Sequence, residues 1–216
     1  MVQSWLTSTT LGANVENLTL LGAGTSNGYG NALMNEITGS VWNNYLDGGD
    51  ATDWLWDNLG DDTVRGGLGN DLVSGDFGND LVYGDDGDDA VEGGEGNDLI
   101  RGEGGADTLY GDTGADQFTY ATAAESTVAG FDRIMDFVRG MDKIDLSAID
   151  ANSAVAGNQT FNWTGAQPFF ASPADLYFRS SLIGSVVEGD LNGNKIADFR
   201  VVVVGVYDMS AADFVL

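Results

Sequence analysis

The chain has no cysteine and no histidine among its 216 residues, and only 2 prolines and 8 lysines and arginines. Without cysteine, no disulfide can stabilise the fold. Without histidine, the chain lacks the usual zinc ligand and the base of a Ser-His-Asp or Cys-His system. No apolar run is long enough for a membrane span, and the N-terminal sequence MVQSWLTSTT has neither the basic nor the apolar part of a signal peptide.

Acidic residues are in large excess, because 34 aspartates and glutamates leave a formal charge of −26 at pH 7. This charge argues against a nucleic acid as partner. Carboxylates that are stacked close together repel one another unless a cation lies between them. The net negative charge therefore favours the binding of a cation over the binding of an anion.

A nine-residue unit repeats eight times without interruption from Gly48 to Thr119. Positions one and four are glycine in seven of the eight units, and position eight is always apolar. A short fixed period predicts a solenoid. Position six is always aspartate, at Asp53, Asp62, Asp71, Asp80, Asp89, Asp98, Asp107 and Asp116. Residues 30–47 keep the period with Asn35 and Asn44 at position six, so we interpret residues 1–47 as an N-terminal strand and a degenerate cap.

Each position of the unit has a chemical role. Glycine permits a tight turn with positive φ and leaves carbonyl oxygens uncovered, and the aspartate adds a carboxylate, so the turn is an oxygen cage for a hard cation. The last three residues form a minimal strand with one side chain inward. Two units then complete one coil of about 18 residues, so aspartates 18 apart pair on one side, which predicts about six Ca²⁺ sites. The glycines expected to adjoin the ions are Gly67, Gly69, Gly78, Gly87, Gly94, Gly96 and Gly105.

The eight units resemble the RTX (repeats-in-toxin) family, whose consensus is GGxGxDxUx. This resemblance implies an all-β fold that begins with a right-handed parallel β-roll over residues 48–119 and binds calcium in its turns. With a single inward residue in nine, the roll buries little apolar surface for the backbone that it orders. We therefore expect the roll to need calcium in order to fold.

The nine-residue period stops after Thr119, and residues 120–216 carry longer apolar stretches that predict antiparallel strands in a sandwich-like cap. The segment FDRIMDFVRGMDKIDLSAID resembles the C-terminal domain of serralysin-type secreted metalloproteases, and the resemblance covers nearly all of residues 30–216. Such proteases need a HExxH helix, which a chain without histidine cannot contain. We therefore predict that this chain is not itself an enzyme, and that a catalytic domain, if any, lies upstream in a larger polypeptide.

Two groups outside the repeats are further candidates for cation binding. Glu125 lies 18 residues after Asp107, at the next same-side sixth position, and Asp132 lies near the following turn for Asp116; solvated surface acids are the alternative. The segment from Asp190 to Asp198 has the spacing of the start of an EF-hand loop but lacks its final glutamate. A hairpin turn held by asparagine side chains is the favoured interpretation there.

The chain ends with an acid and three apolar residues, Asp213, Phe214, Val215 and Leu216. In the resembled family such an ending belongs to a secretion signal read by a type I ABC exporter, which implies a secreted, extracellular protein without an N-terminal signal peptide. On physical grounds alone, the same residues could form a terminal strand or helix packed on the sandwich. We favour the export signal.

A second function rests on outward-facing side chains of the roll. Arg65, Tyr83 and Arg101 are predicted to form one column on one sheet, and Trp54 and Trp56 lie outward on the other. Such a ladder could bind an anionic polysaccharide, much as the similar repeat modules of bacterial mannuronan epimerases assist a catalytic partner. The alternatives are ordinary cross-strand packing and, for the tryptophans, contact with an upstream domain. The primary prediction is a calcium-dependent folding and secretion module, and polysaccharide binding is the alternative.

Overall fold

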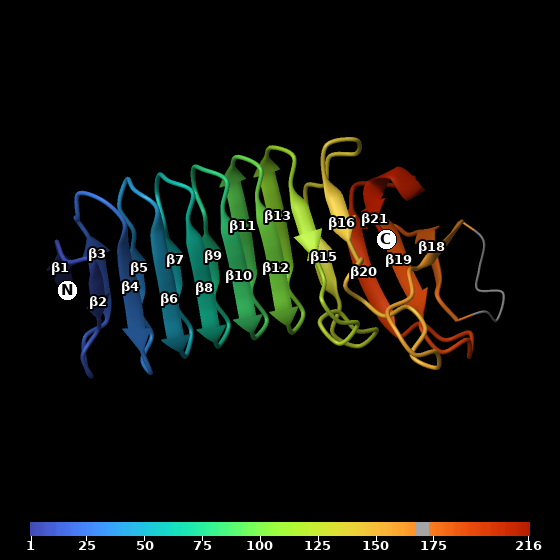
Figure 1. Cartoon of the computed structure of the whole chain (residues 1–216), viewed down its shortest axis with the longest axis horizontal. Helices are drawn as coiled ribbons and strands as arrows, with labels where there is room; N and C mark the ends of the chain where they lie inside the picture. Colours follow the sequence, from blue (N-terminus) through green and yellow to red (C-terminus); the bar gives the residue numbers. More distant parts are fainter. Residues whose placement is uncertain (167–172) are drawn as a thin grey trace.

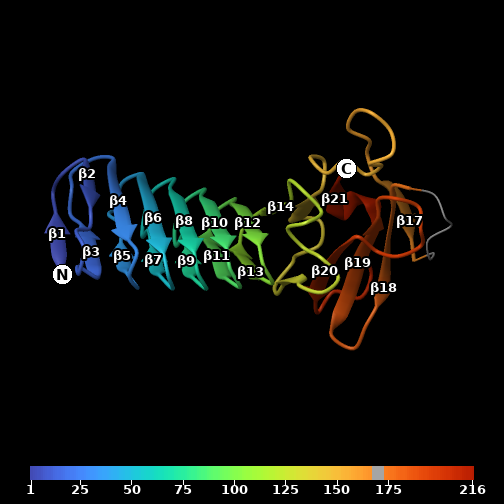
Figure 2. The same cartoon turned by 90° about the horizontal axis from the view of Figure 1, so that it is seen from below.

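The computed structural model describes residues 1–166 and 173–216. Within these residues the strands form two sheets, one of 12 strands and one of 9, that face each other along an elongated molecule (Figures 1 and 2). Successive strands of residues 2–145 alternate between the two sheets, so the chain winds as a solenoid from the N-terminal end toward a broader C-terminal part. The predicted all-β fold with a parallel β-roll is confirmed.

The strand bounds follow the two sheets in spatial order. The first sheet contains β1 (Val2–Ser4), β3 (Asn17–Leu20), β5 (Glu36–Thr38), β7 (Trp54–Trp56), β9 (Leu72–Ser74), β11 (Ala90–Glu95), β13 (Thr108–Thr113), β15 (Asp132–Ile134), β20 (Phe199–Val204), β19 (Gly184–Asp190), β18 (Asp175–Ser180) and β17 (Asn162–Gly165). The second contains β2 (Ser8–Thr10), β4 (Ser26–Asn31), β6 (Asn44–Asp50), β8 (Thr63–Leu68), β10 (Leu81–Asp86), β12 (Leu99–Gly104), β14 (Gln117–Thr119), β16 (Lys143–Asp145) and β21 (Phe214–Val215). A short 3-10 helix, η1 (Ala211–Asp213), precedes β21.

The register of the roll follows the two-unit coil. Val82 of β10 pairs in parallel with Val64 of β8 on one side and with Ile100 of β12 on the other, each 18 residues away. The apolar residues at position eight, from Leu55 to Phe118, are at most 1% exposed and lie between the two sheets. The pairing at 18 residues and the inward direction of position eight were both predicted correctly, because a single apolar residue in each unit leaves one register that buries it.

The strands of the central repeats are longer than the three residues that the sequence predicted. β8, β10, β11, β12 and β13 each span six residues, because the ladder continues past position nine into the first residues of the next turn. Asp85, at position two, pairs with Gly67 and Glu103 on the neighbouring coils. The turns of successive coils are therefore in hydrogen-bonding contact, and this contact fixes the spacing of their side chains.

The C-terminal part continues both sheets of the roll. β20 adds to β15 in parallel, and β19 and β18 then follow as antiparallel neighbours. β21 adds to β16 in parallel and ends the second sheet. The predicted antiparallel strands are present, but parallel pairs join them to the roll, since each sheet of the roll offers an open edge that the C-terminal strands cover. None of the helices in the described residues is long and apolar enough to cross a membrane.

Candidate metal centre

The aspartates at position six form two rows along the roll, one on each side. Each carboxylate accepts a hydrogen bond through Oδ1 from the backbone N–H of the residue 18 positions earlier, which is Asn35 for Asp53, Asn44 for Asp62 and an aspartate for the other six. These N–H to Oδ1 distances are 2.7 to 3.0 Å for the pairs 53/71, 62/80, 71/89, 80/98, 89/107 and 98/116. The structure thus brings together all eight predicted aspartates in the six predicted pairs.

The second oxygen of each carboxylate is buried without a partner. The Oδ2 atoms of all eight repeat aspartates have no hydrogen-bond donor among residues 1–166 and 173–216, and these side chains are at most 4% exposed. A buried carboxylate oxygen without a donor is costly unless a cation or a proton satisfies it. The rows therefore present a regular series of buried carboxylate oxygens that a cation or a proton would satisfy.

Glycine at position one makes room for these oxygens. A Cβ atom on Gly66 would lie 2.5 Å from Asp71 Oδ2 and 2.6 Å from the carbonyl oxygen of Gly84, on the next coil of the same side. Gly75 is placed in the same way against Asp80 Oδ2 and the carbonyl of Gly93, both at 2.7 Å. The absence of a side chain thus lets a carboxylate oxygen and a carbonyl oxygen approach one point between stacked turns.

The predicted turn glycines fall into two classes. Gly67 and Gly94, at position two, have φ of 109° and 107°. Gly69, Gly78, Gly87, Gly96 and Gly105, at position four, have φ between 142° and 152° and lie so close to the previous coil that a Cβ would collide with its backbone. In the described part of the chain no three acidic side chains converge as a metal site by themselves, so backbone carbonyls would have to complete the coordination that calcium prefers.

Burial raises the pKa of these carboxyl groups in the ion-free chain. It raises the pKa of Asp53, Asp80, Asp89 and Asp116 to about 7, although the hydrogen bond from the backbone of the preceding coil lowers it. With the same opposing effect of the backbone hydrogen bond, burial raises the pKa of Asp62, Asp71 and Asp107 to about 6. Burial also raises the pKa of Asp98. Near neutral pH, protons and cations would compete for these oxygens.

The register after the last repeat differs from the one expected by continuing the nine-residue frame. Asp132, not Glu125, follows Asp107 in its row, because its Oδ1 accepts the Asp107 N–H at 3.0 Å. Asp142 follows Asp116 in the same way at 3.1 Å. The spacing grows to 25 and 26 residues because the segment between β14 and β15 lengthens the coil. Asp142 is a member of the row that the sequence reasoning missed.

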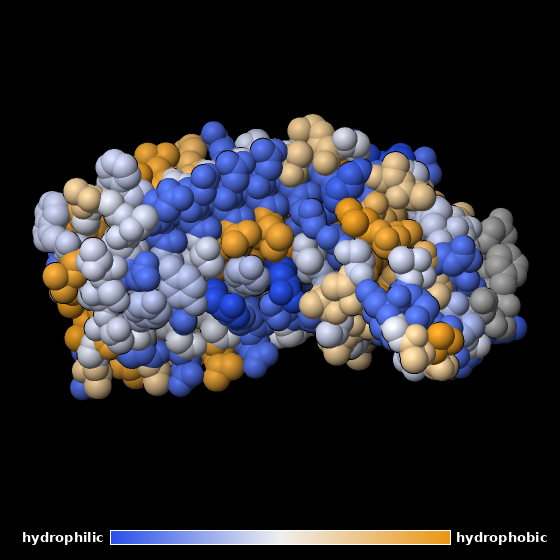
Figure 3. All heavy atoms as spheres, viewed as in Figure 1, coloured by the Kyte–Doolittle hydropathy of each residue, from blue (hydrophilic) through white to orange (hydrophobic). Residues whose placement is uncertain are grey.

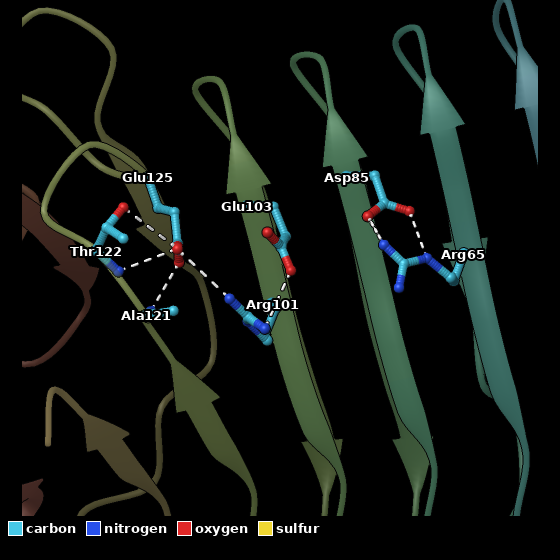
Figure 4. Close-up of polar contacts among 7 residues, drawn as sticks. All are labelled: Arg65, Asp85, Arg101, Glu103, Ala121, Thr122 and Glu125. Atoms are coloured by element: carbon cyan, nitrogen blue, oxygen red, sulfur yellow. Dashed lines mark hydrogen bonds and ion pairs between the residues drawn. The ribbon is translucent and has the colours of Figure 1, made fainter. Parts of the chain in front are cut away.

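Glu125 lies outside the aspartate rows. Its carboxylate accepts hydrogen bonds from the backbone N–H groups of Ala121 and Thr122 at 2.9 and 3.0 Å and forms an ion pair with Arg101 (Figure 4). Asp132 Oδ2 has no donor within hydrogen-bonding geometry in the described chain, like the repeat aspartates. Burial raises the pKa of Asp132 to about 8 overall, although the Tyr120 hydroxyl is close enough to lower it. Of Glu125 and Asp132, only Asp132 therefore continues one of the aspartate rows.

The loop from Asp190 to Asp198 is the connection of the β19–β20 hairpin. Asp190 accepts hydrogen bonds from the backbone N–H groups of Asn192, Gly193 and Lys195. Asp198 accepts from the Asn192 side chain and from the Leu191 backbone. The acids of this loop are therefore used by the protein's own donors, as expected for a hairpin turn held by side chains.

The four C-terminal residues are packed against the cap. Phe214 and Val215 form β21, whose register pairs them with Ile144 and Asp145 of β16. Asp213 is 2% exposed and accepts hydrogen bonds from the Ser210 N–H and hydroxyl. Leu216 packs against the apolar core. In the folded chain these residues are thus a packed terminal segment, of which Phe214 and Val215 form the strand.

The predicted column of Arg65, Tyr83 and Arg101 is present on β8, β10 and β12. The two guanidinium carbons lie 5.0 and 5.9 Å from the centre of the Tyr83 ring. Acids already pair with both arginines, Asp85 with Arg65 and Glu103 and Glu125 with Arg101 (Figure 4). These ion pairs leave the column little positive charge to offer an anionic polymer.

Trp54 and Trp56 lie on β7, in the other sheet, with their ring centres 6.3 Å apart in an edge-to-face arrangement. Trp54 is 46% exposed, and further exposed apolar residues, including Trp5 and Trp42, lie toward the N-terminal end. Figure 3 shows apolar residues at that end, whereas hydrophilic residues cover much of the upper edge along the middle of the roll. The tryptophans and the arginine column thus lie on different sheets.

Comparison with known proteins agrees with this geometry. The family model for the serralysin C terminal of M10 peptidases matches residues 61–216. The metalloprotease AprA of Pseudomonas entomophila is 43% identical over 90 residues, which cover 41% of this chain and 18% of that protein. Serralysin A of Dickeya chrysanthemi is 36% identical over 99 residues, which cover 46% of this chain and 20% of that protein. The chain thus matches only about a fifth of these relatives.

Two solved structures are also similar, both solution structures of subunits of the Azotobacter vinelandii mannuronan C5-epimerase. One is 24% identical over 68% of this chain and 88% of its own, with a TM-score of 0.52. The other is 28% identical over 78% of this chain and 80% of its own, with a TM-score of 0.44. The first of these similarities supports the fold.

The family match covers well over half of the chain and includes seven of the eight repeat aspartates and the C-terminal strands. RTX β-roll domains of this kind are non-catalytic, in agreement with the prediction that the chain is not itself an enzyme. The chain belongs to the family of serralysin C-terminal domains.

Proposed function

We propose that this chain is a calcium-dependent folding and secretion module of a larger exported protein. The observation that carries the proposal is the series of buried Oδ2 atoms, one in each repeat, that have no donor among the described residues. Calcium prefers carboxylate and carbonyl oxygens in a flexible arrangement. The turns of this roll offer both kinds of oxygen at the point where glycine leaves space.

The residues that would hold the ions are the aspartates of the two rows, Asp53 to Asp116, together with carbonyl oxygens of the position-one glycines. This arrangement accounts for about six ions between stacked repeats, and Asp132 would extend one row into the cap. Each bound ion would supply the positive charge that the carboxylates lack. The coils would then stack without repulsion, so calcium binding and folding of the roll would be one process.

Secretion would follow from this coupling. Where calcium is scarce the roll would stay unfolded and could pass through a type I ABC exporter, and calcium outside the cell would fold each emerging coil and oppose its return. The tail, Asp213 to Leu216, would be read by the exporter before it docks as β21. A catalytic domain upstream in the same polypeptide would be the cargo, since the matched relatives are about five times longer than the matched segments.

Calcium binding is tested by counting ions. Native mass spectrometry and calorimetric titration of the wild-type chain should find about six or more Ca²⁺ per chain, at affinities of about 0.1 to 1 mM typical of extracellular modules. Asp80→Asn should lower the count, whereas the exposed-site control Asp86→Asn should leave it unchanged. A wild-type chain that binds no calcium would refute the proposal.

The tail is tested by secretion through a matched ABC exporter. Val215 is 38% exposed in β21, so Val215→Asp should change the proposed signal while leaving the packing of Phe214 nearly intact. We expect export of this variant to fall strongly, while the purified variant still folds with calcium. Deletion of residues 213–216 should block export. Export of both variants at the wild-type rate would show that the tail is only a packed strand.

A further inference from the structure

Two turns at the N-terminal end of the rows carry asparagine where the repeats carry aspartate. Asn35 Oδ1 accepts the backbone N–H of Asn31 at 2.7 Å, and Asn44 Oδ1 accepts that of Ser40 at 2.5 Å. The Nδ2 group of each donates to backbone carbonyls of the preceding coil, such as that of Ser26. In both turns the protein itself satisfies the amide, and the asparagine brings no charge.

The two asparagine turns differ at position one of the next coil on the same side. The Asn35 turn faces Gly48 there, as in the consensus, whereas the Asn44 turn faces Asp57. Asp57 is fully buried, with 0% of its surface exposed. Neither of its carboxylate oxygens has a hydrogen-bond partner in residues 1–166 and 173–216. Each of the other seven repeats has a glycine at this position and, in the described chain, one unpartnered carboxylate oxygen, on the aspartate at position six.

The Asp57 carboxylate lies in the hollow that the consensus turns use. A Cβ atom on Gly39 would collide with Asp57 Oδ1 and would lie 2.9 Å from Asn44 Oδ1. In the consensus turn of Gly66, the atom in the equivalent place is Oδ2 of Asp71, at 2.5 Å. A carboxylate oxygen therefore occupies the same hollow in both turns, although it comes from position six in one and from position one of the next coil in the other.

We propose that the Asn44 turn is an additional calcium site, in which the carboxylate of Asp57 replaces the missing carboxylate of position six. This inference rests on the proposed function, because the ion and the surrounding carbonyl oxygens are of the same kind. Asn44 Oδ1 and the unpartnered Oδ2 of Asp62, the aspartate of the same unit as Asp57, are the neighbouring oxygens that could share the ion. The Asn35 turn, with Gly48 in the matching place, has no such carboxylate and would bind none.

The charge around Asp57 agrees with a bound cation. Burial, and after it the nearby carboxylates of Asp62, Asp80 and Asp76, together raise its pKa to about 9. An isolated acid in this place would be expelled or neutralised. Glycine, which stands here in the other seven units, would avoid the cost of burying the acid altogether. Calcium gives the carboxylate a function that explains why it is buried.

The test is to count ions in matched variants of the whole chain. Asp57→Asn keeps the shape of the side chain and removes its charge, and Asp57→Gly restores the consensus residue. Asp50→Asn removes the same charge from an exposed position of the neighbouring unit and serves as the control. Native mass spectrometry at saturating calcium should show about one ion fewer in both Asp57 variants and no change in the control.

The result would also separate this site from the function proposed above. Asp57→Gly should raise the calcium concentration needed for half folding if the site binds an ion, but should stabilise the chain at all calcium concentrations if Asp57 is only a buried neutral acid. Variants that bind as many ions as a calcium-binding wild type would overturn this inference alone. A wild-type chain without bound calcium would overturn both proposals.

Discussion

The roll and the cap treat buried acids in opposite ways. In the cap, Glu188 is 3% exposed and receives hydrogen bonds from Tyr177 and from Nε of Arg200, the latter at 2.7 Å, as well as an ion pair with Arg179. In the roll, Asp80 is 1% exposed and has an Oδ2 atom without a donor in the described chain. The cap therefore carries its own counter-charges, whereas the described part of the roll leaves these carboxylate oxygens without any.

The boundary between the two regions can be located by the same criterion. Asp132 keeps one oxygen without a partner among the described residues. Asp142, the next member of the other row, has both oxygens engaged, by the backbone N–H groups of Asp116 and Val138. The series of unpartnered row oxygens in the described chain thus ends between β15 and β16, although the sheets continue without a break.

Removal of calcium should produce the largest difference between the regions. With excess chelator at neutral pH, we expect most of the β-sheet signal of the roll to disappear in far-UV circular dichroism, because the carboxylates of each row repel one another. Addition of calcium should restore it cooperatively. Magnesium at the same concentration should restore less, since it demands stricter geometry and keeps its water. An unchanged spectrum in chelator would show that the roll needs calcium no more than the cap does.

Single substitutions should separate the two kinds of acid. Glu188→Gln should lower the free energy of unfolding of the cap by about 3 kcal/mol at any calcium concentration, because it breaks a buried ion pair. Asp80→Asn keeps the acceptor for the Asp62 N–H and should cost about 1.5 to 3 kcal/mol only when calcium is present. Asp53→Asn, next to the Asn35 turn, should cost less than Asp80→Asn. Chemical denaturation with and without calcium measures these effects.

The pH dependence should have opposite signs in the two regions. The raised pKa values of the ion-free roll, about 6 to 7 for most repeat aspartates, mean that protonation stabilises it. This stability is complete below the unfolded pKa of about 4 and is lost as pH rises through the folded pKa. For Glu188, burial raises the pKa, but Tyr177 and Arg200 outweigh it and hold the pKa below its ordinary value. Its stabilisation is therefore lost in acid as pH falls through that lowered pKa.

The sign for the roll can be measured by circular dichroism between pH 8 and pH 5. In chelator, the roll should gain β structure as the pH falls. In calcium, the concentration needed for half folding should rise over the same range, because protons compete for the Oδ2 atoms. A calcium midpoint that does not change between pH 8 and pH 6 would contradict the account of the roll.

The smallest effect is expected for anionic polysaccharide. Since Asp85, Glu103 and Glu125 already pair with Arg65 and Arg101, titration with alginate should leave the tryptophan fluorescence of the calcium-loaded chain nearly unchanged. Asp85→Asn, which frees Arg65, should be the variant most able to bind. Tight binding by the wild type would revive the second function and would show that the ion pairs open.

Much of the roll could be predicted because its local and long-range contacts share one period. One apolar residue in nine sets which side chains lie inward, and the 18-residue coil then sets which aspartates meet, as for Asp80 and Asp98. Past Thr119 the coil length changes, and the sequence contains no signal for the new length. Continuing the nine-residue period therefore predicts that Glu125 follows Asp107, whereas Asp132 does, and the period gives no indication of Asp142.

The long-range strand pairs of the cap and the role proposed for Asp57 could not be predicted from the sequence in the same way. The addition of β20 to β15 joins segments about 70 residues apart, and alternation of apolar residues does not specify such a partner. Asp57 is an ordinary exception to the glycine consensus in the sequence. Only its position against Gly39 and Asn44 shows that its carboxylate occupies the hollow of a consensus turn.

Hydrogen–deuterium exchange with and without calcium tests the central claim most directly, since it follows both regions in one experiment. The backbone N–H groups of Asp62, Asp71, Asp80 and Asp89 donate to the aspartates of the next coil, so they should exchange slowly in calcium and rapidly in chelator. The amides of β19 and β20 should change much less. Equal protection of the aspartate amides in both conditions would contradict the claim that the roll takes its counter-charge from calcium.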